Sequence, residues 1–115
     1  MPFEKLLKDI VENIDAKGAI LLDWEGEGVV HYGKIDEYDL KVIGAYQVII
    51  LNHLKDVHKG KEVMFFQMKF SSLVAQFMPV NKDYYVLLLF ENKEIAPKAL
   101  HKLMDIVQVF AKEIA

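Results

Sequence analysis

The feature that most constrains the fold is an uninterrupted apolar run, YYVLLLF, at residues 84–90. Successive side chains of a β-strand point to opposite faces of its sheet, so this strand is apolar on both faces. Both faces must then be covered, which makes it a central strand with helices on each side of the sheet. Most of the segment from Gly18 to Trp24 has the same character. The sequence therefore predicts a three-layer α/β/α sandwich.

Three segments have the spacing of three and four residues that indicates an amphipathic helix. The first spans residues 3–14, and its apolar positions are Phe3, Leu6, Leu7, Ile10, Val11 and Ile14. The second runs from about Asp36, where acidic groups suit a helix start, to about His58, and its end is marked by Lys55, Lys59 and Gly60. The third has Pro97 in its first turn, and its buried face is Leu100, Leu103, Ile106, Val107, Phe110 and Ile114.

The remaining segments predict five strands. Residues 18–24 and 29–32 form a hairpin, because the turn between them contains glycines that can take positive φ. Residues 62–70, 73–80 and 84–90 form a three-strand meander. The predicted order is αββαβββα within one domain that spans residues 1–115.

Composition excludes several classes of function. The chain has no cysteine, which rules out disulfides and thiolate metal sites, and its net charge of −3 gives no basic excess for nucleic acid. No apolar run is long enough to cross a bilayer, and the N-terminal residues do not resemble a signal peptide. We therefore expect a cytoplasmic protein that neither binds nucleic acid nor inserts into a membrane.

No pattern predicts catalysis, a metal site or a cofactor. The four histidines are not spaced as ligands on a helix, and they are His31, His53, His58 and His101. His101 and Asp105 share a helix face, which is typical of a solvated pair. The acidic turn at residues 23–28 lacks the calcium-loop pattern, and no phosphate-binding or nucleophile motif surrounds its glycines or Ser71. We expect a non-enzyme.

The second helix is apolar on more than one face. One face, interpreted as the core face, carries Leu40, Ile43, Ile50, Leu54 and Val57. Val42, Gly44, Ala45, Val48, Ile49 and Leu51 remain apolar outside it. A domain of this size has little room to enclose a helix on all sides, so self-association is favoured over a fully buried helix. In this interpretation Gly44 and Ala45 let a partner helix approach closely.

The third predicted strand supports association. Met64, Phe66, Met68 and Phe70 make one face wholly apolar, and Val63 and Phe65 continue the apolar character on the other. An edge strand of this kind exposes backbone groups that invite pairing with another chain. The predicted interface is Val42, Gly44, Ala45, Val48, Ile49, Val63, Phe65 and Gln67.

The chain resembles the roadblock, or dynein light-chain, family in element order, in the hairpin Gly18-Ala19-x-x-x-Asp23-x-x-Gly26, in the two-faced second helix and in the apolar last strand. The resemblance implies an α+β, profilin-like fold with an antiparallel sheet in the order 2-1-5-4-3. It also implies dimerisation through the second helix and third strand, and binding of a small Ras-like GTPase as regulator or scaffold. All fourteen basic residues are lysine, so the chain cannot supply an arginine finger.

The resulting hypothesis is a non-catalytic dimeric module, paired with an identical or a related chain. The GTPase is expected to bind across the paired second helices, through Lys41, Gln47, Asn52 and Lys55. The alternative is a profilin-like module that senses a small ligand between sheet and helix. Its candidate lining residues are Gln67, Gln76, Tyr84 and Tyr85.

Overall fold

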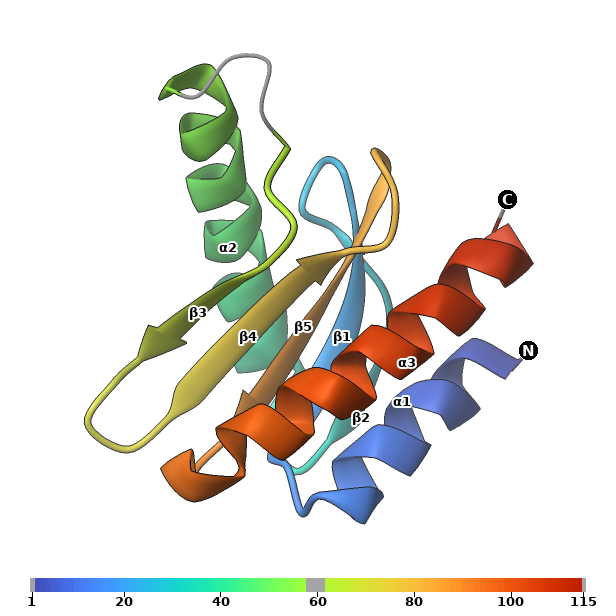
Figure 1. Cartoon of the computed structure of the whole chain (residues 1–115), viewed down its shortest axis with the longest axis vertical. Coiled ribbons are helices and arrows are strands. Elements are labelled where there is room, and N and C mark those ends of the chain that lie inside the picture. Colours follow the sequence, from blue (N-terminus) through green and yellow to red (C-terminus); the bar gives the residue numbers. More distant parts are fainter. Residues whose placement is uncertain (1, 58–61, 115) are drawn as a thin grey trace.

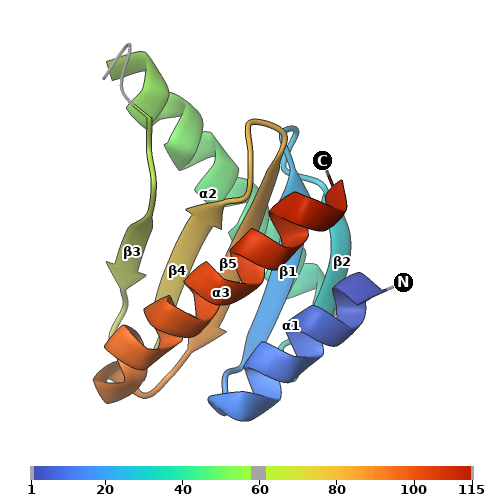
Figure 2. The same ribbon diagram turned by 45° about the vertical axis from the view of Figure 1, so that its right-hand side comes forward.

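The computed structural model describes residues 2–57 and 62–114, and it confirms the predicted architecture (Figure 1). A five-stranded antiparallel sheet has the strand order β2-β1-β5-β4-β3. The elements are α1 (Pro2–Asn13), β1 (Gly18–Asp23), β2 (Gly28–Gly33), α2 (Glu37–Val57), β3 (Phe66–Lys69), β4 (Val74–Pro79), β5 (Tyr84–Phe90), the short 3-10 turn η1 (Lys93–Ile95) and α3 (Ala96–Ile114). Helices α1 and α3 lie side by side on one face of the sheet, and α2 lies alone on the other (Figure 2).

The two strands predicted to be central are central. β5 pairs with β1 on one side and with β4 on the other. Residues 86–90 of β5 and residues 19–22 of β1 are fully buried. Their alternate side chains enter two separate cores, since Leu21 and Leu88 pack beneath α1 and α3 while Leu22 and Leu87 pack beneath α2. This is the physical consequence of an apolar run without a polar face.

Local chemistry sets the turns that position α2. The Asp23 carboxylate accepts the backbone N–H groups of Glu25 and Glu27 at 2.9 and 3.0 Å, and Gly26 takes a φ of +87°. The hairpin turn is therefore closed as the glycine pattern predicts. At the start of α2, an Asp36 carboxylate oxygen accepts the N–H of Tyr38 at 3.1 Å, which satisfies one of the unpaired amides of the first turn.

The third strand is shorter than predicted. It begins at Phe66 rather than at Glu62, and Val63 and Phe65 explain the difference. In a regular strand these two side chains would share a face, yet Val63 packs with the core beneath α2 and Phe65 with the core beneath α1 and α3. The segment that precedes β3 is thus not a regular strand. The predicted end of the second helix at His58, Lys59 and Gly60 lies outside the described residues, and α2 is described to Val57.

Candidate interaction surface on the α2 face

Helix α2 contacts the sheet through a stripe different from the predicted one. Its buried residues are Leu40, Gly44, Gln47, Val48 and Leu51. Ile43, Ile50 and Leu54, assigned by the sequence to the core face, are only half-buried, and Val57 is 74% exposed. The helix is rotated from the predicted orientation, because the side of α2 on which Gly44 lacks a side chain faces the sheet.

Gly44 brings α2 close to β1. A Cβ atom at this position would lie 2.8 Å from Cδ2 and 2.9 Å from Cδ1 of Leu22. Gly44 therefore faces the sheet of its own chain at a close contact with Leu22, whereas the sequence interpretation directed it at a partner helix. Val48 is 3% exposed on the same stripe. Gly44 and Val48, both predicted at the interface, are thus buried within the single chain.

Gln47 is also misplaced by the sequence interpretation. The side chain was expected to face outward toward a partner, but it is 4% exposed, and its Oε1 atom has no hydrogen-bond partner among the described residues. The helical repeat of 3.6 residues explains the burial, because Gln47 follows Leu40 and Gly44 on one stripe. The sequence signal that could have indicated this burial is the position of Gln47, a polar residue, on a stripe of otherwise apolar residues.

The two flanks of α2 face opposite ends of the sheet. A Cβ atom on Gly26 would lie 3.5 Å from the Ala45 Cα, and one on Gly28 would lie 3.4 Å from the Lys41 Cε, so Ala45 and Lys41 face the β1–β2 hairpin. By helical geometry the opposite flank points toward β3. That flank carries the half-buried Ile43, Ile50 and Leu54. We call it the β3-facing flank.

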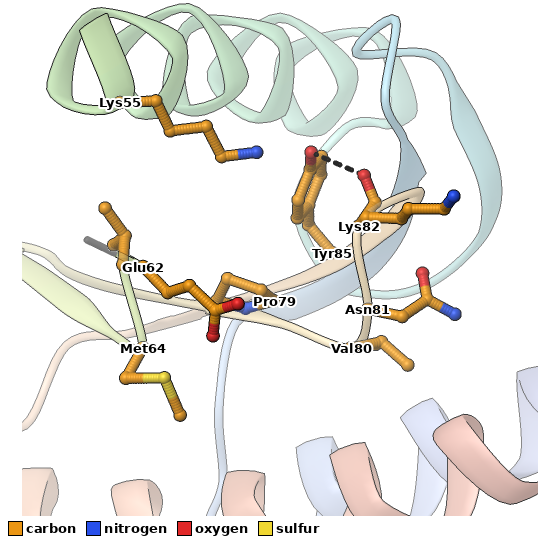
Figure 3. Close-up of a pocket in the computed structure, with 9 residues that line it drawn as sticks. Lys55, Glu62, Met64, Pro79, Val80, Asn81, Lys82 and Tyr85 are labelled. Atoms are coloured by element: carbon orange, nitrogen blue, oxygen red, sulfur yellow. Dashed lines mark hydrogen bonds between the residues drawn. The ribbon is translucent and has the colours of Figure 1, made fainter. Parts of the chain in front are cut away.

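The outer surface of α2 is partly apolar. Its large exposed side chains are Tyr38 at 72%, Tyr46 at 61% and Ile49 at 50% exposure. Val42 is half-buried between them, and His53 is exposed. Lys41, Asn52 and Lys55 are exposed, although the Lys55 ammonium points toward the Tyr85 ring and not away from the sheet (Figure 3). The helix therefore presents an aromatic and aliphatic ridge bordered by lysine and amide groups.

Strand β3 is the edge strand predicted for the interface, because it pairs only with β4. Phe66 and Met68 are half-buried and pack with the core beneath α2, and Phe66 lies 4.8 Å from Phe77 between ring centroids. On the opposite face, Gln67 Oε1 accepts a hydrogen bond of 2.8 Å from Gln76 Nε2, which also donates to the Ala96 carbonyl at 3.0 Å. Phe70 and Met64, beyond either end of β3, are 46% and 72% exposed.

A cavity of about 570 Å³ opens between the C-terminal part of α2, the segment before β3 and the β4–β5 turn (Figure 3). Lys55 Nζ lies 5.7 Å from the ring centroid of Tyr85, whose hydroxyl donates to the Lys82 carbonyl at 3.3 Å. Glu62 and Met64 form another wall.

Of the four residues expected to line a ligand pocket, only Tyr85 lines this cavity. Gln67 and Gln76 bond to each other on the opposite face of the sheet, and Tyr84 packs with the core beneath α1 and α3. The sequence missed the contribution of Lys55, because the α2 residues that come near β5 depend on the rotation of the helix.

The described histidines are placed as ordinary surface groups. His31 Nε2 lies 3.4 Å from a Glu37 carboxylate oxygen, and His101 Nε2 lies 4.0 Å from an Asp105 oxygen. His58 lies outside the described residues. Within residues 2–57 and 62–114, no three His, Cys, Asp or Glu side chains gather as a metal site. No helix in that part of the chain is long and apolar enough to cross a membrane.

The fold is shared with proteins of known structure. MglB of Myxococcus xanthus aligns with a TM-score of 0.87 and 11% identity over 99% of this chain and 95% of that one. A Roadblock/LC7 domain from Streptomyces avermitilis gives 0.83 and 14% over 96% of both chains. Profilin IA of Acanthamoeba castellanii gives 0.65 and 9% over 98% and 99%. No protein-family model and no curated sequence matches the chain. The predicted roadblock and profilin-like fold is thus confirmed by structural similarity.

Proposed function

We propose that this protein is a cytoplasmic, non-catalytic roadblock module that forms a homodimer and binds a small Ras-like GTPase. The observation that carries the proposal is the incomplete cover of the α2 face of the sheet. Neighbouring strands lie about 4.8 Å apart and a helix is about 10 Å across, so one helix cannot cover five strands. The strand farthest from the β1–β2 hairpin, β3, is one of the two edges of the sheet, and β2 is the other.

The half-buried apolar residues of this face supply the surface for a second copy. They lie on both sides of the space between α2 and β3, and they are Ile43, Ile50, Leu54, Phe66 and Met68. A second copy related by a two-fold axis at β3 would bring the same residues of its own chain against them. Pairing at the edge would also satisfy the open backbone groups of β3. We therefore propose β3 and the β3-facing flank as the centre of the interface.

The outer surface of α2 is then left for the GTPase. Two copies of α2 on one face of a continuous sheet would form a platform twice as wide as that of one chain. Tyr38, Tyr46 and Ile49 supply contact area, while Lys41 and Lys55 supply charge at the rim. The GTPase as the partner follows from the resemblance to roadblock proteins. Because the chain has no arginine, regulation would act by positioning groups of the GTPase itself.

A titration tests the proposal. The dimer is titrated with the Ras-like GTPases of the source genome, each loaded with GDP and with a GTP analogue. We expect one of them to bind, and we expect Lys41→Glu with Lys55→Glu to slow association about tenfold at low salt, since rim charges act mainly on encounter. The matched control is Lys5→Glu with Lys8→Glu, the same charge change on the exposed side of α1. Binding to no GTPase, or equal slowing by the control, contradicts the proposed function.

The cavity favours a second candidate, a ligand-sensing module. Its volume is within the usual range for small-molecule sites, and Lys55 beside the Tyr85 ring would attract an anionic, partly apolar ligand. Lys55→Met should then abolish a ligand-induced rise in melting temperature that the wild type shows in a screen of organic acids. A screen without any such rise rejects this candidate.

A further inference from the structure

Pro79 explains why the cavity opens between the segment before β3 and the β4–β5 turn. Continued at the same register, the β3–β4 ladder would place Met64 opposite Pro79. The Leu73 carbonyl accepts the N–H of Phe70, so the backbone groups of Leu73 face β3, and so do those of every second residue along β4 as far as Pro79. Proline has no N–H to donate to the ladder. The pairing therefore ends at Phe66, and the preceding segment separates from β4.

The wall that β5 and the β4–β5 turn contribute to the cavity is held in place by burial and by hydrogen bonds. Tyr85 is 2% exposed, and its hydroxyl is fixed by its bond to the Lys82 carbonyl. Asn81 Oδ1 accepts the backbone N–H groups of Asp83 and Tyr84 at 2.8 and 2.9 Å. Such a wall loses little conformational freedom when a ligand binds, which favours affinity.

Two opposite charges line this cavity from separate elements. Lys55 belongs to α2, and its ammonium extends toward the Tyr85 ring (Figure 3). Glu62 belongs to the segment before β3, and its carboxylate extends toward Pro79, whereas Lys82 extends away from both charges (Figure 3). Neither Lys55 nor Glu62 forms an ion pair within residues 2–57 and 62–114. The cavity therefore offers one positive and one negative group to a ligand.

We propose, resting on the ligand-sensing candidate above, that the cavity binds a zwitterionic amino acid with an apolar side chain, with Lys55 bound to the carboxylate and Glu62 to the ammonium group. The apolar side chain of the ligand packs against Val63, Pro79 and the Tyr85 ring, which line the same cavity. A carboxylate without an ammonium group leaves Glu62 unpartnered and is repelled by it, and an amine without a carboxylate meets the same penalty at Lys55. Both should bind more weakly than the zwitterion.

The cavity is separate from the proposed homodimer interface. None of the residues at the centre of that interface lines it, namely Ile43, Ile50, Leu54, Phe66 and Met68. Binding of the amino acid can therefore be measured whether the chain is a monomer or a dimer.

Thermal shift followed by calorimetric titration of the full chain tests the ligand class. The common amino acids are screened for a rise in melting temperature, and each one that gives a rise is titrated beside the acid and the amine that lack one of its charged groups. For phenylalanine these are hydrocinnamate and phenethylamine. We expect an amino acid to bind, and we expect the loss of either charged group to weaken its binding at least about tenfold, since hydrogen bonds between charged groups are the strong ones.

Two variants test the roles of the two side chains. Glu62→Gln should weaken the binding of the amino acid about tenfold without weakening that of the acid, and Lys55→Met should weaken both. The matched controls are Glu94→Gln and Lys98→Met, at exposed positions of η1 and α3, and neither should change the affinity. All four substituted residues are exposed, and the melting temperature of each variant without ligand verifies that the fold is retained.

The outcomes separate the zwitterionic ligand from the ligand-sensing candidate on which it rests. If the acid or the amine binds as tightly as the amino acid, or if Glu62→Gln leaves the affinity for the amino acid unchanged, the zwitterionic ligand is rejected and a ligand-sensing module is retained. If neither the amino acids nor the corresponding acids bind, both are rejected.

Discussion

The two faces of the sheet are covered to different extents. Helices α1 and α3 lie side by side on one face and enclose a core that includes Leu7, Leu88, Leu103 and Phe110, each with no exposed surface. The single helix α2 encloses a smaller core on the other face and leaves the side chains of Phe66 and Met68 half-buried. One face is covered by two helices, and the other is covered by one (Figure 2). Association is therefore expected to depend on the second face.

The largest expected effect comes from Gly44. In Gly44→Trp the indole must enter the contact between α2 and Leu22, so the free energy of unfolding should fall by about 3 kcal/mol. Gly44→Ala is the matched control, because the Leu22 methyl groups can rotate away and alanine gains up to about 1 kcal/mol of helix propensity. Denaturant unfolding at two protein concentrations measures both. If Gly44→Trp unfolds like the wild type and only dissociates the dimer, Gly44 faces a partner helix instead.

The next effect is on the dimer dissociation constant, and it is tested by the same substitution on the β3-facing flank and on the outer surface of α2. Ile43→Asp would bury a carboxylate in the proposed interface and should raise the dimer dissociation constant at least about 30-fold, or about 2 kcal/mol. Ile49→Asp, on the outer surface, should change it by less than about threefold. Sedimentation measures both constants, and Ile50→Asp repeats the test on the same flank should Ile43→Asp unfold.

The outcome also tests the predicted contact of Val42, Ala45 and Ile49 with a second copy. A larger effect of Ile49→Asp than of Ile43→Asp would place the interface on the outer surface of α2. The β3-facing flank would then be excluded from the proposal.

A smaller effect on stability is expected on the face of the sheet that α1 and α3 cover. Gln76→Leu removes two hydrogen bonds, to Gln67 and to the Ala96 carbonyl, but it also removes a buried Oε1 atom that has no partner among the described residues. Each hydrogen bond contributes about 1 kcal/mol, and the relief of the unpaired oxygen offsets part of the loss, so a net destabilisation of about 1 kcal/mol is expected. Thermal unfolding measures it. A more stable Gln76→Leu variant would show that the network is not needed for stability.

The smallest effect is a pH dependence of stability that arises from a hydrogen bond between α1 and β2. The Tyr32 hydroxyl donates to a Glu12 carboxylate oxygen at 2.8 Å, and this hydrogen bond, followed by desolvation and by the charges of Glu12 and Glu4, raises the pKa of Tyr32 above its usual value of 10.0. A raised pKa means that the folded state favours the protonated phenol. The stabilisation is therefore fully present below pH 10 and is lost as the pH rises through the folded pKa.

Tyr32→Phe should accordingly be slightly less stable than the wild type at neutral pH, and the difference should disappear in alkaline solution. Tyr46→Phe, at an exposed position on α2, is the control and should show no such trend. Unfolding curves across the alkaline range measure both variants. A constant difference between Tyr32→Phe and the wild type at every pH would mean that the hydroxyl contributes without its bond to Glu12.

The sequence alone determined the architecture of the protein. The double-sided apolar run at residues 84–90 required helices on both faces, the glycine turn at Gly26 required a hairpin, and the three periodic segments became α1, α2 and α3. These features are local, since strand alternation, helical periodicity and turn chemistry are all set by neighbouring residues. The strand order and the position of β3 at the edge followed from the resemblance and agree with the structure.

Only the tertiary structure decided which stripe of α2 meets the sheet. Apolar residues surround most of this helix, so periodicity admitted several orientations, and a stripe containing Ile43 and Ile50 was as apolar as the one actually buried. Packing selected the stripe of Gly44, because the missing side chain lets the helix axis approach Leu22, and that choice buried Gln47. Close approach depends on residues 22 and 44 meeting in space. Whether two residues so far apart in the chain make contact depends on how the side chains between helix and sheet pack. The periodicity of apolar residues along the sequence does not contain that information.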